Sequence, residues 1–192
     1  MLSKFRSVTL MALLIFTCLA QAKDDDGAFA LKGIGTATCN RYIDAAANEK
    51  PELLQIAGYV TGYISAYNEL SEDTFDLLPW QQMDTLMLLM LQQCRQNPQL
   101  TIGMAVSQLA RYFSATKLAQ QSAMQEITSG GSTFYLYPQV LEQLTKALRE
   151  RGYASGDLVA DLNRFKQENQ IKGEHPFAQL VILKLLYSKD PA

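Results

Sequence analysis

The sequence is poor in residues that commonly build active sites. It has one histidine and three cysteines among 192 residues, and neither charge sign forms a long block. Because 17 basic residues face 19 acidic ones, the strong positive charge expected of a nucleic-acid-binding protein is missing. With 48% hydrophobic and 19% charged residues, the composition suits one or two folded domains. It excludes a disordered tail and a polytopic membrane protein.

Sequence motifs for catalysis are also missing. The sequence has no G-x-S-x-G and no G-x-x-x-x-G-K-[ST], and Gly33-Ile34-Gly35 lacks the third glycine of a dinucleotide site. His175 stands in a loop before an expected helix, where a solvated turn residue is the usual case. We therefore expect a protein that is not an enzyme, with no catalytic residues, no metal site and no cofactor.

The N-terminus has the three parts of a secretory signal. Lys4 and Arg6 precede an apolar run over 8–20, and Ala20-Gln21-Ala22 gives a small-x-small cleavage site. The alternative is a membrane anchor, but the run is shorter than the roughly 20 residues that span a bilayer. We expect a signal peptide over 1–22, a periplasmic location, and no membrane span after cleavage.

Cleavage would leave two cysteines, Cys39 and Cys94. In an exported protein an even pair is most simply a disulfide, and the chain-entropy model gives a loop of this length about 4 kcal/mol of stabilisation. A redox pair or a metal site is the alternative. Neither has support, because the sequence has no C-x-x-C and too few further ligands.

Hydrophobic periodicity predicts a helical domain over 23–119. Its apolar residues recur three or four positions apart in four segments, which cover residues 36–48, 51–67, 80–94 and 101–119. The third segment is the most apolar and stops before Asn97-Pro98. We expect it to form the buried centre of this domain.

The helix over 51–67 carries two stripes that could bind a partner. Small residues four positions apart form a shallow groove where another helix can approach closely. A stripe of tyrosines lies beside it, where half-buried core residues are the more common case, although aromatic residues are also enriched at interfaces. The candidate partner-binding residues are Gly58, Tyr59, Gly62, Tyr63 and Tyr67, together with Tyr135 and Tyr137.

Residues 120–133 lose the helical period and end in Ser129-Gly130-Gly131-Ser132, a composition typical of a flexible linker. The following module, residues 134–192, shows three more helical segments, over 138–151, 157–169 and 176–187. The predicted fold class is therefore all-α: a disulfide-stapled four-helix domain plus a small three-helix module.

The first half resembles the HdeA-type periplasmic proteins and the related helical immunity proteins of type VI secretion systems. The resemblance covers about residues 33–115 and rests on three short stretches, which are Thr38-Cys39-Asn40-Arg41-Tyr42-Ile43, Gly58-Tyr59-Val60-Thr61-Gly62-Tyr63, and a helix that ends at Cys94 before Asn97-Pro98. It implies either an acid-stress periplasmic chaperone or an immunity protein against a secreted toxin. The additional cysteines usual in the immunity proteins are absent.

The second half resembles a degenerate peptidoglycan-binding-like module of three helices, over residues 138–187. The matching positions are Leu144, Leu148, Gly152, Tyr153, the stretch 160–167 and Ile171. Where the family has a longer loop this chain has only Ser155-Gly156-Asp157, so the fold is implied more strongly than the sugar-peptide groove.

Together these features predict a non-enzymatic periplasmic interaction protein. Its partner would be a protein or a component of the cell wall, and not a nucleic acid. An acid-stress chaperone and an immunity protein are the alternatives. Protonation of the 19 carboxylates would leave a large positive charge and loosen the fold, which is the physical basis for the chaperone.

Overall fold

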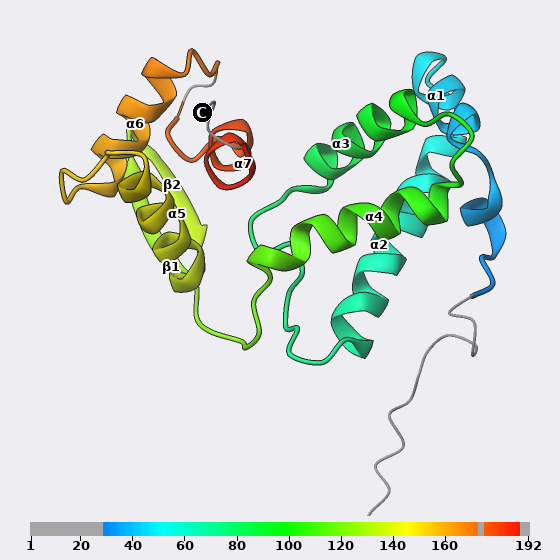
Figure 1. Cartoon of the computed structure of the whole chain (residues 1–192), viewed down its shortest axis with the longest axis horizontal. Coiled ribbons are helices and arrows are strands. Elements are labelled where there is room, and N and C mark those ends of the chain that lie inside the picture. The colour runs from blue at the N-terminus through cyan, green and yellow to red at the C-terminus, as the bar shows by residue number, and fades with distance from the viewer. Residues whose placement is uncertain (1–28, 173–174, 189–192) are drawn as a thin grey trace, which may run out of the picture. The chain divides into compact units, whose positions relative to one another are not determined.

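The computed structural model describes residues 29–172 and 175–188 (Figure 1). The predicted signal peptide over 1–22 lies outside these residues. The chain divides into two compact units, Met1–Leu31 and Lys32–Ala192, and every helix and strand described below lies in the second unit. The predicted boundary between residues 119 and 134 remains a prediction.

The first half of the described chain is helical, as the periodicity predicts. After a short 3-10 turn, η1, it contains four α-helices and ends in a second 3-10 turn, η2. The bounds are η1 Gly33–Thr36, α1 Cys39–Ala47, α2 Glu52–Leu70, α3 Met83–Gln96, α4 Ile102–Phe113 and η2 Ser114–Thr116. The Thr101 side chain caps α4 by accepting a hydrogen bond from the N–H of Met104 at 3.2 Å.

The predicted disulfide is confirmed and ties the start of α1 to the end of α3. Cys39 and Cys94 are fully buried, with their Cα atoms 4.9 Å apart. Main-chain hydrogen bonds hold the same corner: the N–H of Cys39 donates to Leu100 O at 2.7 Å, and the N–H of Ile102 donates to Ala37 O at 2.8 Å. The start of α1 is therefore fixed to α3 and to the loop before α4.

One hydrophobic core joins α1 to α4. The apolar positions that set the helical period of α2 and α3 point into it and are almost completely buried; they are Ile56, Val60, Ile64, Leu86 and Met90. Phe113, at the end of α4, is also fully buried there. The third helical segment is not the buried centre that we expected: α3 buries only Leu86, Met90 and Cys94, and Leu88 is 67% exposed, whereas α4 buries seven of its residues.

The prediction of a purely α-helical fold is wrong, because the structure contains a two-stranded antiparallel sheet. Strands β1, Gln125–Ser129, and β2, Ser132–Leu136, pair with Ser129 opposite Ser132. Gly130 and Gly131 have φ values of +59° and +79°, the left-handed conformation that a tight two-residue hairpin turn requires. The glycine pair assigned to a flexible linker therefore forms the turn of a β-hairpin.

Three helices follow the hairpin, as predicted: α5 Pro138–Glu150, α6 Leu158–Glu168 and α7 Gln179–Tyr187. Asp157 caps α6, since its Oδ1 accepts the N–H groups of Val159 and Ala160 at 2.9 and 3.1 Å. These helices and the inner face of the hairpin enclose a second core, in which Leu136, Val140, Leu144, Leu162 and Phe165 are buried.

Helix α7 contacts both cores. Leu183 and Tyr187 pack against each of the two clusters of buried residues. The Tyr187 ring lies 4.8 Å from that of Tyr112 and 5.1 Å from that of Phe113, and its hydroxyl is hydrogen-bonded to Thr116. Burial raises the pKa of Tyr187 to about 12. Within the described residues, no helix combines the length and apolar character needed to span a membrane.

Candidate functional site

The small-residue groove predicted on α2 is an exposed surface. We call the surface around Leu54, Gly58 and Gly62 the α2 face. Gly58 and Gly62 are exposed, and a Cβ atom built on either would have no described atom within 4 Å outside its own helix backbone. Leu54 is 79% exposed. No helix of the described chain packs into this groove.

The tyrosine stripe of α2 belongs mainly to the first core. Tyr59, Tyr63 and Tyr67 are partly buried and pack against the cluster of buried residues. The Tyr59 ring lies directly on Gly35, where an added Cβ would overlap it. Burial, with a smaller contribution from Tyr63, raises the pKa of Tyr59.

The two tyrosines near the hairpin differ in exposure. Tyr137 is partly buried and meets Phe75 edge-on, with ring centroids 6.2 Å apart. Tyr135, on β2, is 59% exposed, and its hydroxyl donates to Glu126 Oε2 on β1 at 3.2 Å. Of these two residues, Tyr135 is the one that presents its ring to solvent.

Tyr135 also lines an open groove of about 600 Å³, which we call the β2 groove. It is bordered by β2, by the segment before α3 and by the segment that leads into α7. Four successive β2 residues, Thr133–Leu136, line it. Because side chains alternate between the faces of a strand, a groove that contacts four in a row runs along the edge of the strand.

Aromatic rings form one wall of the β2 groove. Phe134 lies 4.5 Å from the His175 ring and 5.2 Å from the Phe177 ring, measured between centroids. The expectation of a solvated turn is wrong for His175, because it is partly buried against Phe134. Its Nδ1 is buried without a hydrogen-bond partner in the described part of the chain.

A second wall of the groove contains Trp80, which is 5% exposed. Gln179, the first residue of α7, fixes this wall through the main chain. Its Nε2 donates to Trp80 O at 2.6 Å, and its Oε1 accepts the N–H of Gln82 at 2.9 Å. Trp80 Nε1 and Gln81 Nε2 are buried donors that have no partner among the described residues.

Sequence periodicity missed this wall. We expected Trp80 to begin the helix over 80–94, but α3 begins at Met83 and Trp80 lies in the preceding loop. Trp80 packs with the second core instead of the first. Pro79 was the available signal, because the geometry around a proline favours a turn or extended segment over a helix.

The β2 groove is almost uncharged. Asp76 is the one carboxylate among its described lining residues, and neither lysine nor arginine is among them. Asp76 Oδ1 accepts the N–H of Leu78 at 2.9 Å. In the described ranges, no group of three or more His, Cys, Asp or Glu residues is placed to hold a metal ion. The chemistry of the groove suits a neutral ligand that offers hydrogen-bonding groups and apolar side chains.

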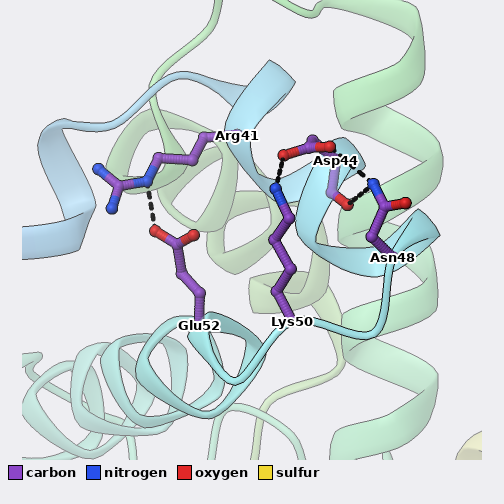
Figure 2. Close-up of polar contacts among 5 residues, drawn as sticks. All are labelled: Arg41, Asp44, Asn48, Lys50 and Glu52. Carbon is purple, nitrogen blue, oxygen red and sulfur yellow. Dashed lines mark hydrogen bonds and ion pairs between the residues drawn. The ribbon is translucent and has the colours of Figure 1, made fainter.

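A polar cluster connects α1 to the start of α2 (Figure 2). Lys50 pairs with Asp44, Arg41 pairs with Glu52, and Asn48 Nδ2 donates to Asp44 Oδ1 at 2.7 Å. The hydrogen bond from Lys50 is the main reason that the pKa of Asp44 lies below its ordinary value. This cluster lies at an exposed corner and contributes an acid-sensitive contact.

Comparison with protein-family models, curated proteins and solved structures finds no match to this chain. The resemblances of the two halves to periplasmic and envelope families therefore remain expectations. The site has to be interpreted from its own geometry.

Proposed function

We propose that the chain is a non-enzymatic periplasmic interaction protein that binds a protein or a cell-envelope component through the β2 groove. The observation that carries this proposal is the groove itself. It is the site where exposed Tyr135, buried Trp80 and the Phe134–Phe177 pair lie around one open space of about 600 Å³. Aromatic side chains of this kind dominate the energetics of protein interfaces.

Rigid support of the groove adds to the proposal. Gln179 holds the main chain of Trp80 and Gln82, while the hairpin fixes Phe134 and Tyr135. A preformed wall loses little conformational entropy when a partner binds. The disulfide is compatible with an oxidising compartment such as the periplasm.

Site-specific photocrosslinking in the full-length chain tests the proposal. A benzoylphenylalanine residue placed at position 135 reports on the β2 groove, and one placed at position 54 reports on the α2 face. We expect a defined adduct from position 135, while position 54, which is even more exposed, serves as the control. Adducts from position 54 alone would contradict the proposal and move the partner site to the α2 face.

A sedimentation assay on isolated cell-wall sacculi separates a glycan partner from a protein partner. If the partner is the cell wall, the full chain co-sediments with protein-free sacculi, and Tyr135→Ser reduces the bound fraction. If the partner is a protein, the chain stays in the supernatant and the position-135 adduct is digested by protease. A chain that neither sediments nor crosslinks at position 135 would contradict the proposed function.

An acid-stress chaperone is the second candidate, because two carboxylates make contacts that acid would break. Asp44 pairs with Lys50, and Glu168 accepts hydrogen bonds from Tyr153 at 2.6 Å and Arg164 at 3.0 Å. These partners lower the pKa of both carboxyl groups. The test is suppression of client aggregation by the full chain at about pH 2 to 3, below the ordinary carboxylate pKa values. Unchanged aggregation at that pH excludes this candidate.

A further inference from the structure

Strand β2 has one paired and one unpaired edge. Ser129 and Ser132 flank the two-residue turn and form a hydrogen-bonded pair, and hydrogen-bonded and non-bonded pairs alternate along an antiparallel ladder. Thr133 and Tyr135 therefore direct their N–H and C=O groups away from β1. These main-chain groups have no hydrogen bond within the described part of the chain.

The β2 groove lies along this unpaired edge. The described residues that line it include Thr133 and Tyr135, whose main-chain groups are free, and none from β1. The free groups stand two residues apart, the spacing at which a neighbouring extended strand presents its own N–H and C=O groups. An extended polypeptide is the ligand that matches this pattern.

The edge also lacks the features that usually prevent strand addition. Natural proteins protect exposed edges with charged residues, proline or bulges. The β2 sequence, Ser-Thr-Phe-Tyr-Leu, contains no charged residue and no proline, and its Thr, Phe and Tyr residues favour strands. In the partner strand β1, by contrast, Glu126 faces solvent.

We infer that the β2 groove binds an extended, largely uncharged peptide segment of a partner protein by adding it as a third strand next to β2. This inference rests on the proposed function, which places the partner in the same groove. The main chain of the peptide would bond Thr133 and Tyr135, and alternate side chains would lie against Phe134 and Phe177. The five residues of β2 match a segment about 17 Å long.

Charge and shape select this occupant. Because Asp76 is the one carboxylate among the described lining residues and no basic residue accompanies it, a basic residue at one end of the peptide is favoured over an acidic one. A second copy of the chain fits less well. Its own strands β1 and β2 contain no basic residue to meet Asp76, and the edge of β1 carries Glu126.

Backbone-methylated peptides test the inference on the full-length protein. The probe is a capped peptide of about six residues with alternating valine and threonine and a terminal lysine. One isomer is N-methylated at the valine nitrogens and another at the threonine nitrogens, so each blocks one edge of the peptide. Strand addition predicts affinities that differ by about tenfold or more between the isomers, since one retains the bonding edge. Replacing the lysine with glutamate should weaken binding.

Matched proline variants test the protein side. Tyr135→Pro removes the outward N–H of β2, Tyr135→Ala keeps it, and Glu126→Pro removes the equivalent group on the other edge of the hairpin. We expect Tyr135→Pro to bind the probe about tenfold more weakly than Tyr135→Ala, and Glu126→Pro to bind like the wild type. Circular dichroism checks that each variant folds. If Tyr135→Pro does not fold, the comparison of the two methylated peptides on the wild type still tests strand addition.

The outcomes separate this inference from the proposed function. Equal binding of the two methylated isomers would overturn strand addition, while an adduct at position 135 would still support a partner in the groove. A second copy of the chain would replace the peptide as the occupant if two results came together. No peptide would bind, and light scattering would show a dimer that Tyr135→Pro abolishes; this would overturn the inference. Loss of both the adduct and peptide binding would remove the proposed function as well.

Discussion

Gln179 and Trp80 are 99 positions apart in the sequence, and a hydrogen bond of 2.6 Å joins the side-chain amide of the first to the main-chain carbonyl of the second. The same amide accepts the N–H of Gln82. One side chain at the start of α7 thus holds two main-chain groups of the loop before α3. The wall of the β2 groove that contains Trp80 depends on this contact.

Replacing Gln179 with alanine should therefore loosen this wall. Trp80 O, whose hydrogen bond is partly buried, would lose its partner, while the exposed N–H of Gln82 would bond to water instead, so we expect a loss of about 1 to 2 kcal/mol of stability. Urea unfolding followed by Trp80 fluorescence measures the change, because the protein has a single tryptophan. Gln167→Ala, at an exposed position of α6, is the control and should stay within about 0.5 kcal/mol of the wild type. Equal stability of both variants would contradict the role given to Gln179.

Removal of the disulfide should destabilise the chain strongly. In the double variant Cys39→Ala/Cys94→Ala we expect a loss of about 2 to 5 kcal/mol in the free energy of unfolding. Both sulfur atoms are buried, so the lost packing adds to the lost cross-link. Urea unfolding with and without a reducing agent is the measurement. Reductant should lower the stability of the wild type and leave the double variant unchanged, and a wild type whose stability does not change in reductant would exclude the bond.

Glycine substitutions should have opposite effects on α2 and on η1. Gly58→Ala and Gly62→Ala should each raise stability by about 0.5 to 1 kcal/mol, because helix propensity improves and the new methyl group meets no neighbour. Gly35→Ala should lower the melting temperature, since its Cβ would overlap the Tyr59 ring. Thermal unfolding compares the three variants. A loss of stability in Gly58→Ala would show that the α2 face is covered in the folded protein.

Stability should fall in acid because of Asp44 and Glu168. Hydrogen bonds from Lys50 to Asp44, and from Tyr153 and Arg164 to Glu168, lower the pKa of each carboxyl group in the folded state. Their contribution is therefore fully present above about pH 4.5, the ordinary range of carboxyl groups, and is lost as the pH falls through the lowered pKa values.

Chemical unfolding at a series of pH values from about 6 to 2 tests this dependence. Asp44→Asn and Glu168→Gln should each flatten the decline of stability with falling pH. Glu142→Gln, at an exposed position of α5, serves as a control of equal charge change and should keep the slope of the wild type. If Asp44→Asn and Glu168→Gln both keep that slope, these two carboxylates are not the acid-sensitive groups.

The existence of the helices could be predicted from the sequence because their apolar residues recur at the helical period, and some of them carry local end signals. Pro51 precedes α2, and Asp157 caps α6. The disulfide could be predicted because the expected cleavage leaves two cysteines. The helices depend on residues that are close together in the sequence, and the disulfide depends on two cysteines that have only each other as a possible partner.

The hairpin and the groove could not be predicted in the same way. Gly130-Gly131 suits both a flexible linker and a tight turn, and the choice depends on whether the flanking residues pair, as Ile127 does with Phe134. The wall at Trp80 depends on Gln179, almost a hundred positions further on. Local patterns carry no information about contacts at that distance.

Hydrogen exchange at single amides of the full-length protein, with and without the valine–threonine peptide, decides whether a third strand forms next to β2. Saturating peptide should slow exchange at Thr133 and Tyr135 by about tenfold or more, while Glu126 and Thr128, on the other edge of the hairpin, exchange at unchanged rates. Unchanged exchange at Thr133 and Tyr135 in the saturated protein, or slowing confined to Glu126 and Thr128, would contradict strand addition.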